Sequence, residues 1–321
     1  MVDRCQDIGG EGVYTVTLSN LLAIVILSRG KCGICKGSSI YLISMATADL
    51  LVIVYNIILI TLAFKYFPVS FLFYTAVCRI NIAMGYATKD CSVWLTIAFT
   101  IDRYVAICCH SLRARYCTEK TAASAVCIVC FVSILRNIPF LFRYQSVGTW
   151  YGVPWGCDLK LEFFTLPGWV AFFWIHHLLN PLIPYLLILL FNALTVRHIV
   201  LANRARRGLR ARSNRDQRGD AEMVNRRKSI ILLFVVSGSF ILLWMTKISV
   251  FLLMEITNDH FYLNYDHPVA IADISGTVLF YLSSCTNTTL YALTQSKFRE
   301  ELTRALKYPF TLISERIPAL K

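Results

Sequence analysis

The feature that most constrains this chain is a series of apolar runs, most of them about 20 residues long and poor in charge. A helix of about 20 residues spans the roughly 30 Å hydrocarbon layer of a bilayer. Of the 321 residues, 56% are hydrophobic and only 16% are charged, whereas soluble domains carry about 25% charged residues. We therefore expect an all-α membrane protein that crosses the bilayer repeatedly.

The apolar runs predict seven spans and a simple domain organisation. The spans cover residues 13–27, 39–63, 78–102, 121–142, 168–200, 228–255 and 268–294. Residues 1–12 are expected to form an extracellular N-terminus, 13–294 the seven-helix bundle, and 295–321 an amphipathic eighth helix with a cytoplasmic tail. The first run has about 15 residues and is short for a bilayer, so we expect an incomplete N-terminus.

The distribution of basic residues predicts the topology. Arginines crowd between Arg197 and Lys228, whereas Lys and Arg are absent between Lys247 and Lys297. This alternation is typical of loops on opposite sides of a membrane. The formal charge of +13 is thereby explained without a nucleic-acid partner. Arg136, near the outer end of the fourth span, is expected to extend to water.

The third run combines length with polarity. From Cys78 to Asp102 a helix extends about 36 Å, so the two residues can lie at opposite interfaces. Lys89, Ser92, Thr96 and Arg103 fall within about 40° of one line along this helix. A polar stripe on a spanning helix should face the interior of a bundle.

At Asp102-Arg103-Tyr104 the chain resembles a known family. This tripeptide closes a third hydrophobic helix that begins with a cysteine, as in rhodopsin-like (class A) G-protein-coupled receptors. Asn20 in the first span, Asp49 in the second and Asn287-Thr-Thr-Leu-Tyr291 in the seventh resemble the same pattern. The resemblance implies a plasma-membrane receptor with its N-terminus outside. Its partners would be a ligand, a heterotrimeric G protein and membrane lipid.

The resemblance also implies specific sites. Cys157 in the second outer loop would form a disulfide with Cys78. The G-protein switch would comprise Asp102, Arg103, Tyr104, Asn287 and Tyr291, with Asp102 holding Arg103 at rest. A polar cavity would contain water or a sodium ion, the one cofactor considered, near Asp49, Ser92, Ser283 and Ser284.

Departures from the family pattern point to one branch. Thr288 replaces the seventh-helix proline, Asn192 replaces a tyrosine, and Trp244 precedes Lys247 by three residues. These features resemble the orphan group around G-protein coupled receptor 139. That resemblance implies an amino-acid-like or peptide ligand and coupling through Gq/11.

A ligand pocket is expected between the third, fifth, sixth and seventh helices. Trp244 would form its floor, Lys89 and Lys247 would bind a carboxylate, and Asp273 would bind an ammonium group. The full set of candidates is Lys89, Gly85, Trp244, Lys247, Asp273 and His177. Lys89 has a structural alternative, namely pairing with Asp90 or Asp49.

Other functions remain open. A receptor-like chain that does not signal would fit the short first span and Thr246, which replaces the sixth-helix proline. An intramembrane hydrolase would need Ser239 with His176 or His177. Cys32-Gly-Ile-Cys35 has the spacing of a redox or zinc pair, but no second pair accompanies it, so a cytoplasmic loop is favoured.

Overall fold

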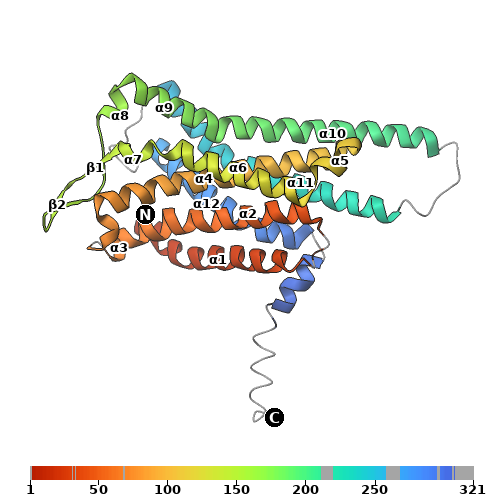
Figure 1. Ribbon diagram of the computed structural model, residues 1–321, viewed down its shortest axis with the longest axis horizontal. Helices are drawn as coiled ribbons and strands as arrows, with labels where there is room; N and C mark the ends of the chain where they lie inside the picture. Colours follow the sequence, from red (N-terminus) through yellow and green to blue (C-terminus); the bar gives the residue numbers. More distant parts are fainter. Residues whose placement is uncertain are drawn as a thin grey trace, which may run out of the picture.

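In the computed structural model the described backbone comprises residues 2–30, 32, 34–67, 69–210, 220–257, 268–294, 297–305 and 307. Side chains are described from Tyr14 onward, except at 205–229, 255–267, 287–296, 308–321 and a few single positions. Over these residues the chain is a bundle of long helices lying side by side, with a strand-rich loop at one end (Figure 1).

The seven spans follow one another in the predicted order. The first span is α1 (Val2–Ser28), and the second is α2 (Lys36–Val52), which continues through the π-helix η1 (Ile53–Leu62) into α3 (Ala63–Tyr66). The third is α4 (Thr75–Cys108), and the fourth is α6 (Glu119–Asn137) followed by α7 (Phe140–Arg143). The fifth is α9 (Pro167–His177), which continues through the π-helix η3 (Leu178–Leu182) into α10 (Ile183–Arg210); the sixth is α11 (Asp220–Thr257) and the seventh α12 (Pro268–Thr294). Short helices η2 (Phe71–Phe73), α5 (His110–Tyr116) and α8 (Glu162–Thr165) lie in the connections.

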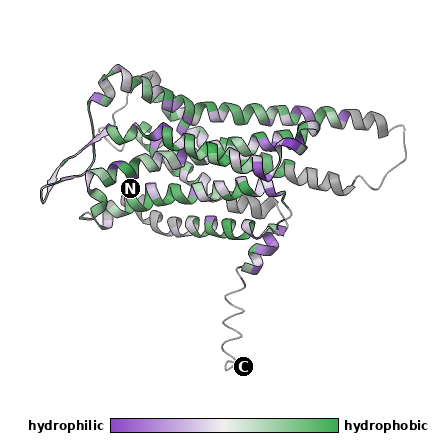
Figure 2. Cartoon of the chain, viewed as in Figure 1, coloured by the Kyte–Doolittle hydropathy of each residue, from purple (hydrophilic) through white to green (hydrophobic). Residues whose placement is uncertain are grey.

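The outer surface of the bundle suits a lipid environment. Within the described residues, five helical stretches are long and apolar enough to cross a bilayer, and two shorter apolar helices cover Tyr14–Ser28 and Pro268–Ser284. Apolar residues dominate the helices, and hydrophilic ones gather towards their ends (Figure 2). On α6, Ile128 and Phe131 are 62% and 63% exposed. The predicted all-α membrane bundle is confirmed.

The fifth span departs from a regular helix at a proline. Asn180 has φ −158° and ψ 97°, outside the helical region. The ring of Pro181 disfavours the α conformation at the preceding residue, which accounts for the irregularity. The resulting bulge turns the Asn180 side chain towards α4, where it bonds Asp90.

The loop after α7 is more ordered than its sequence indicates. Strands β1 (Tyr144–Gln145) and β4 (Asp158–Leu159) pair antiparallel, and β2 (Gly148–Trp150) pairs with β3 (Val153–Trp155) inside them. The predicted disulfide joins Cys157 to Cys78 of α4. The Thr75 hydroxyl also donates to the Gly156 carbonyl at 2.9 Å. The loop is thus attached to the end of α4.

Both ends of the chain differ in detail from the prediction. The first helix begins at Val2 instead of residue 13. Residues 297–305 are helical as expected, but Phe298 is fully buried in a cluster that includes Leu27, Leu42 and Phe99. Leu306 lies outside the described residues. Packing of Phe298 attaches the eighth helix to the bundle core.

Candidate functional site

Within the polar stripe of α4, Ser92 forms a hydrogen bond to the second span. Ser92 Oγ donates to Asp49 Oδ1 at 2.6 Å, and the Asp49 side chain is buried. One turn further, the Thr96 hydroxyl donates to the Ser92 carbonyl at 2.9 Å. Asp49, Ser92 and Thr96 therefore each take part in a hydrogen bond, as a low-dielectric interior favours.

A small polar cavity of about 20 Å³ adjoins this hydrogen bond. It has room for one water-sized species. Its described lining residues are Asp49, Ser92, Thr96, Val236, Ser239, Phe240, Trp244 and Ser283. Ser284 was also expected here but is not among them; its carbonyl instead accepts a hydrogen bond from Asn20 at 2.9 Å. The Asn287 side chain lies outside the described residues.

The ammonium group of Lys89 lies among aromatic rings. Its Nζ is 5.5 Å from the ring centre of Tyr86, 5.7 Å from that of Phe280 and 5.8 Å from that of Tyr281. These distances are within cation–π range. Within the part of the chain that the structure describes, Lys89 forms no ion pair. The alternative that pairs it with Asp90 or Asp49 is therefore wrong.

Lys247 and Asp273 join the sixth and seventh spans. Lys247 Nζ donates to Asp273 Oδ1 at 2.5 Å and to Thr277 Oγ1 at 3.0 Å. At Gly276 a Cβ would lie 3.1 Å from the Lys247 backbone, so glycine permits close approach of α11 and α12. The sequence predicted that Lys247 and Asp273 would each bind a charged group of the ligand. In the structure the two side chains neutralise each other.

The other predicted pocket residues take different positions. Trp244 is buried, stacks on Phe240 with 5.0 Å between ring centres, and lines the small cavity beside Asp49. The His177 ring stacks on Phe251 at 4.6 Å, and its Nδ1 is 2.9 Å from the Phe173 carbonyl oxygen.

Gly85 belongs to a packing contact. It is buried against Asn56 of η1, whose Nδ2 donates to the Gly85 carbonyl at 3.3 Å. A Cβ at this position would lie 2.9 Å from Asn56 Oδ1. The structure thus places Gly85 where the second and third spans approach closely.

Asp90 is the centre of a buried polar network that the sequence does not reveal. Its carboxylate pairs with Arg136 of α6 and accepts hydrogen bonds from Asn137, at 2.5 Å, and from Asn180 of η3. The expectation that Arg136 reaches water is wrong, because its side chain is only 16% exposed. A fully buried carboxylate needs a counter-charge, and this requirement outweighs the hydration of one guanidinium.

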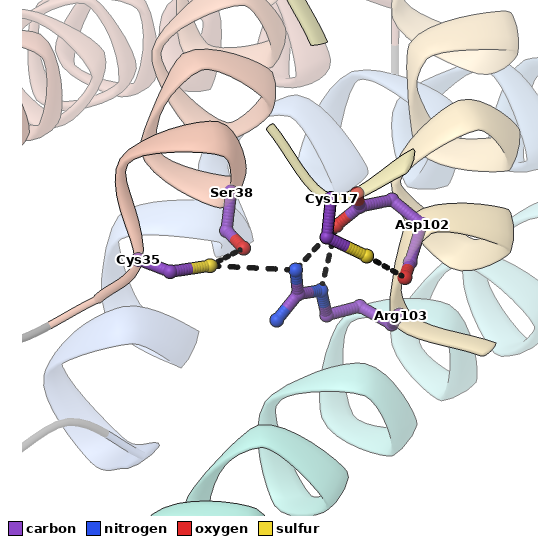
Figure 3. A network of polar contacts seen from close by, with 5 residues as sticks. All are labelled: Cys35, Ser38, Asp102, Arg103 and Cys117. Atoms are coloured by element: carbon purple, nitrogen blue, oxygen red, sulfur yellow. Dashed lines mark hydrogen bonds and ion pairs between the residues drawn. The ribbon is translucent and has the colours of Figure 1, made fainter. Parts of the chain in front are cut away.

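At the opposite end of α4 from Cys78, Asp102 and Arg103 form a buried ion pair. Arg103 Nε donates to Asp102 Oδ2 at 3.0 Å, and both residues are below 10% exposed. Arg103 also contacts Cys35 at the start of α2 (Figure 3). The Tyr104 ring packs on Phe191 at 5.4 Å. The side chains of Asn287 and Tyr291 lie outside the described residues.

Comparison with known families decides the class of protein. Residues 19–291 match the family described as 7 transmembrane receptor (rhodopsin family). The chain belongs to this family. The match extends over most of the chain, from within the first span to near the end of the seventh.

Individual relatives of the receptor have low sequence identity to it but align over most of its length. It is 26% identical to galanin receptor 2a of Danio rerio over 88% of this chain and 72% of that protein. It is 28% identical to the FMRFamide receptor of Drosophila melanogaster over 88% of this chain and 50% of that protein. Somatostatin receptor type 5 of Rattus norvegicus is 27% identical over 92% of this chain and 75% of that protein.

Membership in this family makes the chain a multi-pass G-protein-coupled receptor and not an enzyme. The hydrolase alternative is wrong: the Ser239 hydroxyl donates to the Val236 carbonyl at 2.8 Å. The Asp90 network is the main element that sequence reasoning missed. The sequence signal that could have found it is Asp90 itself, because an ionisable residue inside a membrane requires a partner.

Proposed function

We propose that the receptor converts binding of a small amino-acid-like or peptide ligand with a free carboxylate into activation of a G protein. The coupling we propose is to Gq/11, and the branch is the orphan group around G-protein coupled receptor 139. The observation that supports the ligand class is the ammonium of Lys89, surrounded by aromatic rings and without an ion pair in the described part of the bundle.

Charge balance argues for one anionic ligand group. Asp90 is neutralised by Arg136, and Lys247 by Asp273, so Lys89 keeps an uncompensated charge at membrane depth. Such a charge is costly unless a partner arrives. A ligand carboxylate supplies that partner, and the rings of Tyr86, Phe280 and Tyr281 offer an apolar and aromatic surface to the rest of the ligand.

The switch would act at the other end of α4. At rest Asp102 holds Arg103. In the active state the sixth span moves outward, Arg103 leaves Asp102, and an element of the G protein enters the opened crevice. The ligand drives this change only by its higher affinity for the active state.

The small cavity suits a sodium ion that stabilises the resting state. Asp49 supplies a carboxylate and Ser92 and Ser283 supply hydroxyl oxygens around about 20 Å³. A bound ion would place a positive charge beside the Asp49 carboxylate. If ligand affinity does not change with sodium concentration in either the wild type or Asp49→Asn, this proposal is contradicted.

We further propose that the end carrying Arg103 faces the cytoplasm and the N-terminus lies outside the cell. The cluster of arginines between Arg197 and Lys228 supports this orientation through the positive-inside rule. The disulfide-linked loop then faces the oxidising side of the membrane.

The test is a calcium and cAMP assay in cells that express wild type, Lys89→Met or Arg103→Ala. Aromatic amino acids and short peptides are compared with their methyl esters, which lack the negative charge. We expect an agonist that requires the free carboxylate and loses about tenfold or more potency with Lys89→Met. Arg103→Ala should abolish the response at equal surface expression. Unchanged potency with Lys89→Met would place the ligand elsewhere.

A further inference from the structure

The Cys32-Gly-Ile-Cys35 motif divides into two different cysteines in the structure. Cys32 is buried, and its Sγ lies 3.7 Å from the Ile26 carbonyl oxygen. Cys35 is the residue before the first turn of α2, is accessible, and has its Sγ 2.7 Å from the Ser38 hydroxyl. The two thiols of this motif therefore have separate surroundings.

Cys35 meets the switch arginine across a helix boundary. Arg103 donates from one terminal nitrogen of its guanidinium to Cys35 Sγ at 3.5 Å (Figure 3). Asp102 is the neighbour of Arg103 on α4, so their ion pair holds the guanidinium without linking two helices. The contact with Cys35 does link them, because Cys35 lies at the start of α2.

Local electrostatics favours the thiolate form of Cys35. Burial raises the pKa of its thiol, but the Arg103 guanidinium and the Ser38 hydroxyl lower it by more, so the pKa lies below the ordinary value. Burial and the Asp102 carboxylate raise the pKa of Cys117 to about 11. Cys117 therefore stays a thiol and donates to the Asp102 carbonyl at 3.6 Å.

We propose that Cys35 is a positioning residue of the switch, whose sulfur holds Arg103 against the inner end of α2 in the resting receptor. Removing or capping that sulfur loosens Arg103 and favours the active state. The proposal rests on the function proposed above for Arg103, but the contact itself has a separate, chemical test. It also makes Cys35 a site at which a thiol-reactive electrophile activates the receptor.

The first experiment measures the contact without any signalling. Iodoacetamide is applied to the full-length receptor in nanodiscs at neutral pH, and labelling of each cysteine is followed by mass spectrometry. The Cys35 thiolate displaces iodide and forms a carbon–sulfur bond. Since a unit of pKa changes the thiolate fraction about tenfold, we expect Cys35 labelling to be about threefold or more slower in Arg103→Gln than in wild type.

Two controls accompany the labelling. Cys32 in the same molecule should label slowly in both proteins, because burial and Glu301 raise its pKa. Arg113→Gln removes an exposed arginine of α5, which has no contact with Cys35 among the described residues, and should leave the Cys35 rate unchanged. Equal Cys35 rates in wild type and Arg103→Gln would overturn the proposal.

The second experiment measures nucleotide exchange on a purified G protein without agonist. Loss of one hydrogen bond in the resting state predicts about twofold to tenfold more basal exchange for Cys35→Ala than for wild type. Cys127→Ala, which removes an exposed cysteine of α6, should match wild type. The proposal would be overturned if basal exchange with Cys35→Ala is no higher than with wild type while Arg103→Ala lowers exchange.

The two experiments separate the two hypotheses. If no variant, wild type included, promotes exchange on any G-protein class, the proposed function fails. The labelling ratio then decides by itself whether Cys35 holds Arg103.

Discussion

Neutralising Asp90 should strongly destabilise the receptor, because the bundle is held at this point by a buried charge pair. The Asp90 carboxylate is 0% exposed and contacts Arg136 from the fourth span and Asn180 from the bulge of the fifth. Asp90→Asn preserves the size of the side chain but leaves the guanidinium of Arg136 without a counter-charge. It also turns one acceptor oxygen into an NH₂ group that faces donors.

The magnitude follows from these contacts. Removing one partner of a buried ion pair costs about 3–5 kcal/mol. Proteins of about 150–250 residues lose about 2–4 °C of melting temperature per kcal/mol, and the loss is smaller in larger proteins, so about 2 °C per kcal/mol applies to this chain. We therefore expect Asp90→Asn to melt about 6–10 °C below wild type. In the double variant Asp90→Asn with Arg136→Met no charge remains buried, so it should recover at least half of that loss.

The assay is fluorescence-detected size-exclusion chromatography of detergent-solubilised receptor after heating. Glu119→Gln is the matched control. It removes the carboxylate of a 3.1 Å pair with Lys36 in which both side chains are more than half exposed, and such surface pairs contribute about 0–1 kcal/mol. If Asp90→Asn melted within about 2 °C of Glu119→Gln, the Asp90 network would not stabilise the bundle as argued.

Two other substitutions test the packing of the bundle, and a mapping experiment tests its disulfide. Gly85→Ala should lower stability by about 1–3 kcal/mol, because its Cβ would lie 2.9 Å from Asn56 Oδ1; Asn56→Ala in the same chain should relieve this cost, and an additive double variant would contradict it. Phe298→Ala should cost about 3–5 kcal/mol in the same melting assay, because the ring is fully buried in the core; wild-type melting would mean that the eighth helix does not dock. Peptide mapping without reduction should recover Cys78 joined to Cys157, and finding both alkylated before reduction would refute the disulfide.

Much of the fold is predictable because a bilayer imposes a simple rule on the chain. Backbone groups in hydrocarbon find no water to bond, and an apolar run of about 20 residues satisfies them within itself as a helix. The seventh helix, Pro268–Thr294, has the predicted bounds. The α4 stripe faces the bundle because residues three and four apart share a face of a helix. These conclusions need only the local sequence.

The partners of the charges could not be predicted in this way. Sequence spacing places Lys89 and Asp90 side by side on one helix, yet Asp90 bonds residues 46 and 90 positions away. Which groups meet depends on how far each helix is rotated and shifted against its neighbours. The bulge before Pro181, which brings Asn180 to Asp90, is one such shift.

The sequence by itself therefore determined the seven spans, their order and the polar face of α4, because hydrophobic length and helical periodicity are local properties. Only the tertiary structure decided that Lys247 pairs with Asp273, that Gly85 packs on Asn56 and that Cys35 meets Arg103. Each of these contacts joins two helices. Its geometry is set by the packing of the whole bundle, and no single segment contains that information.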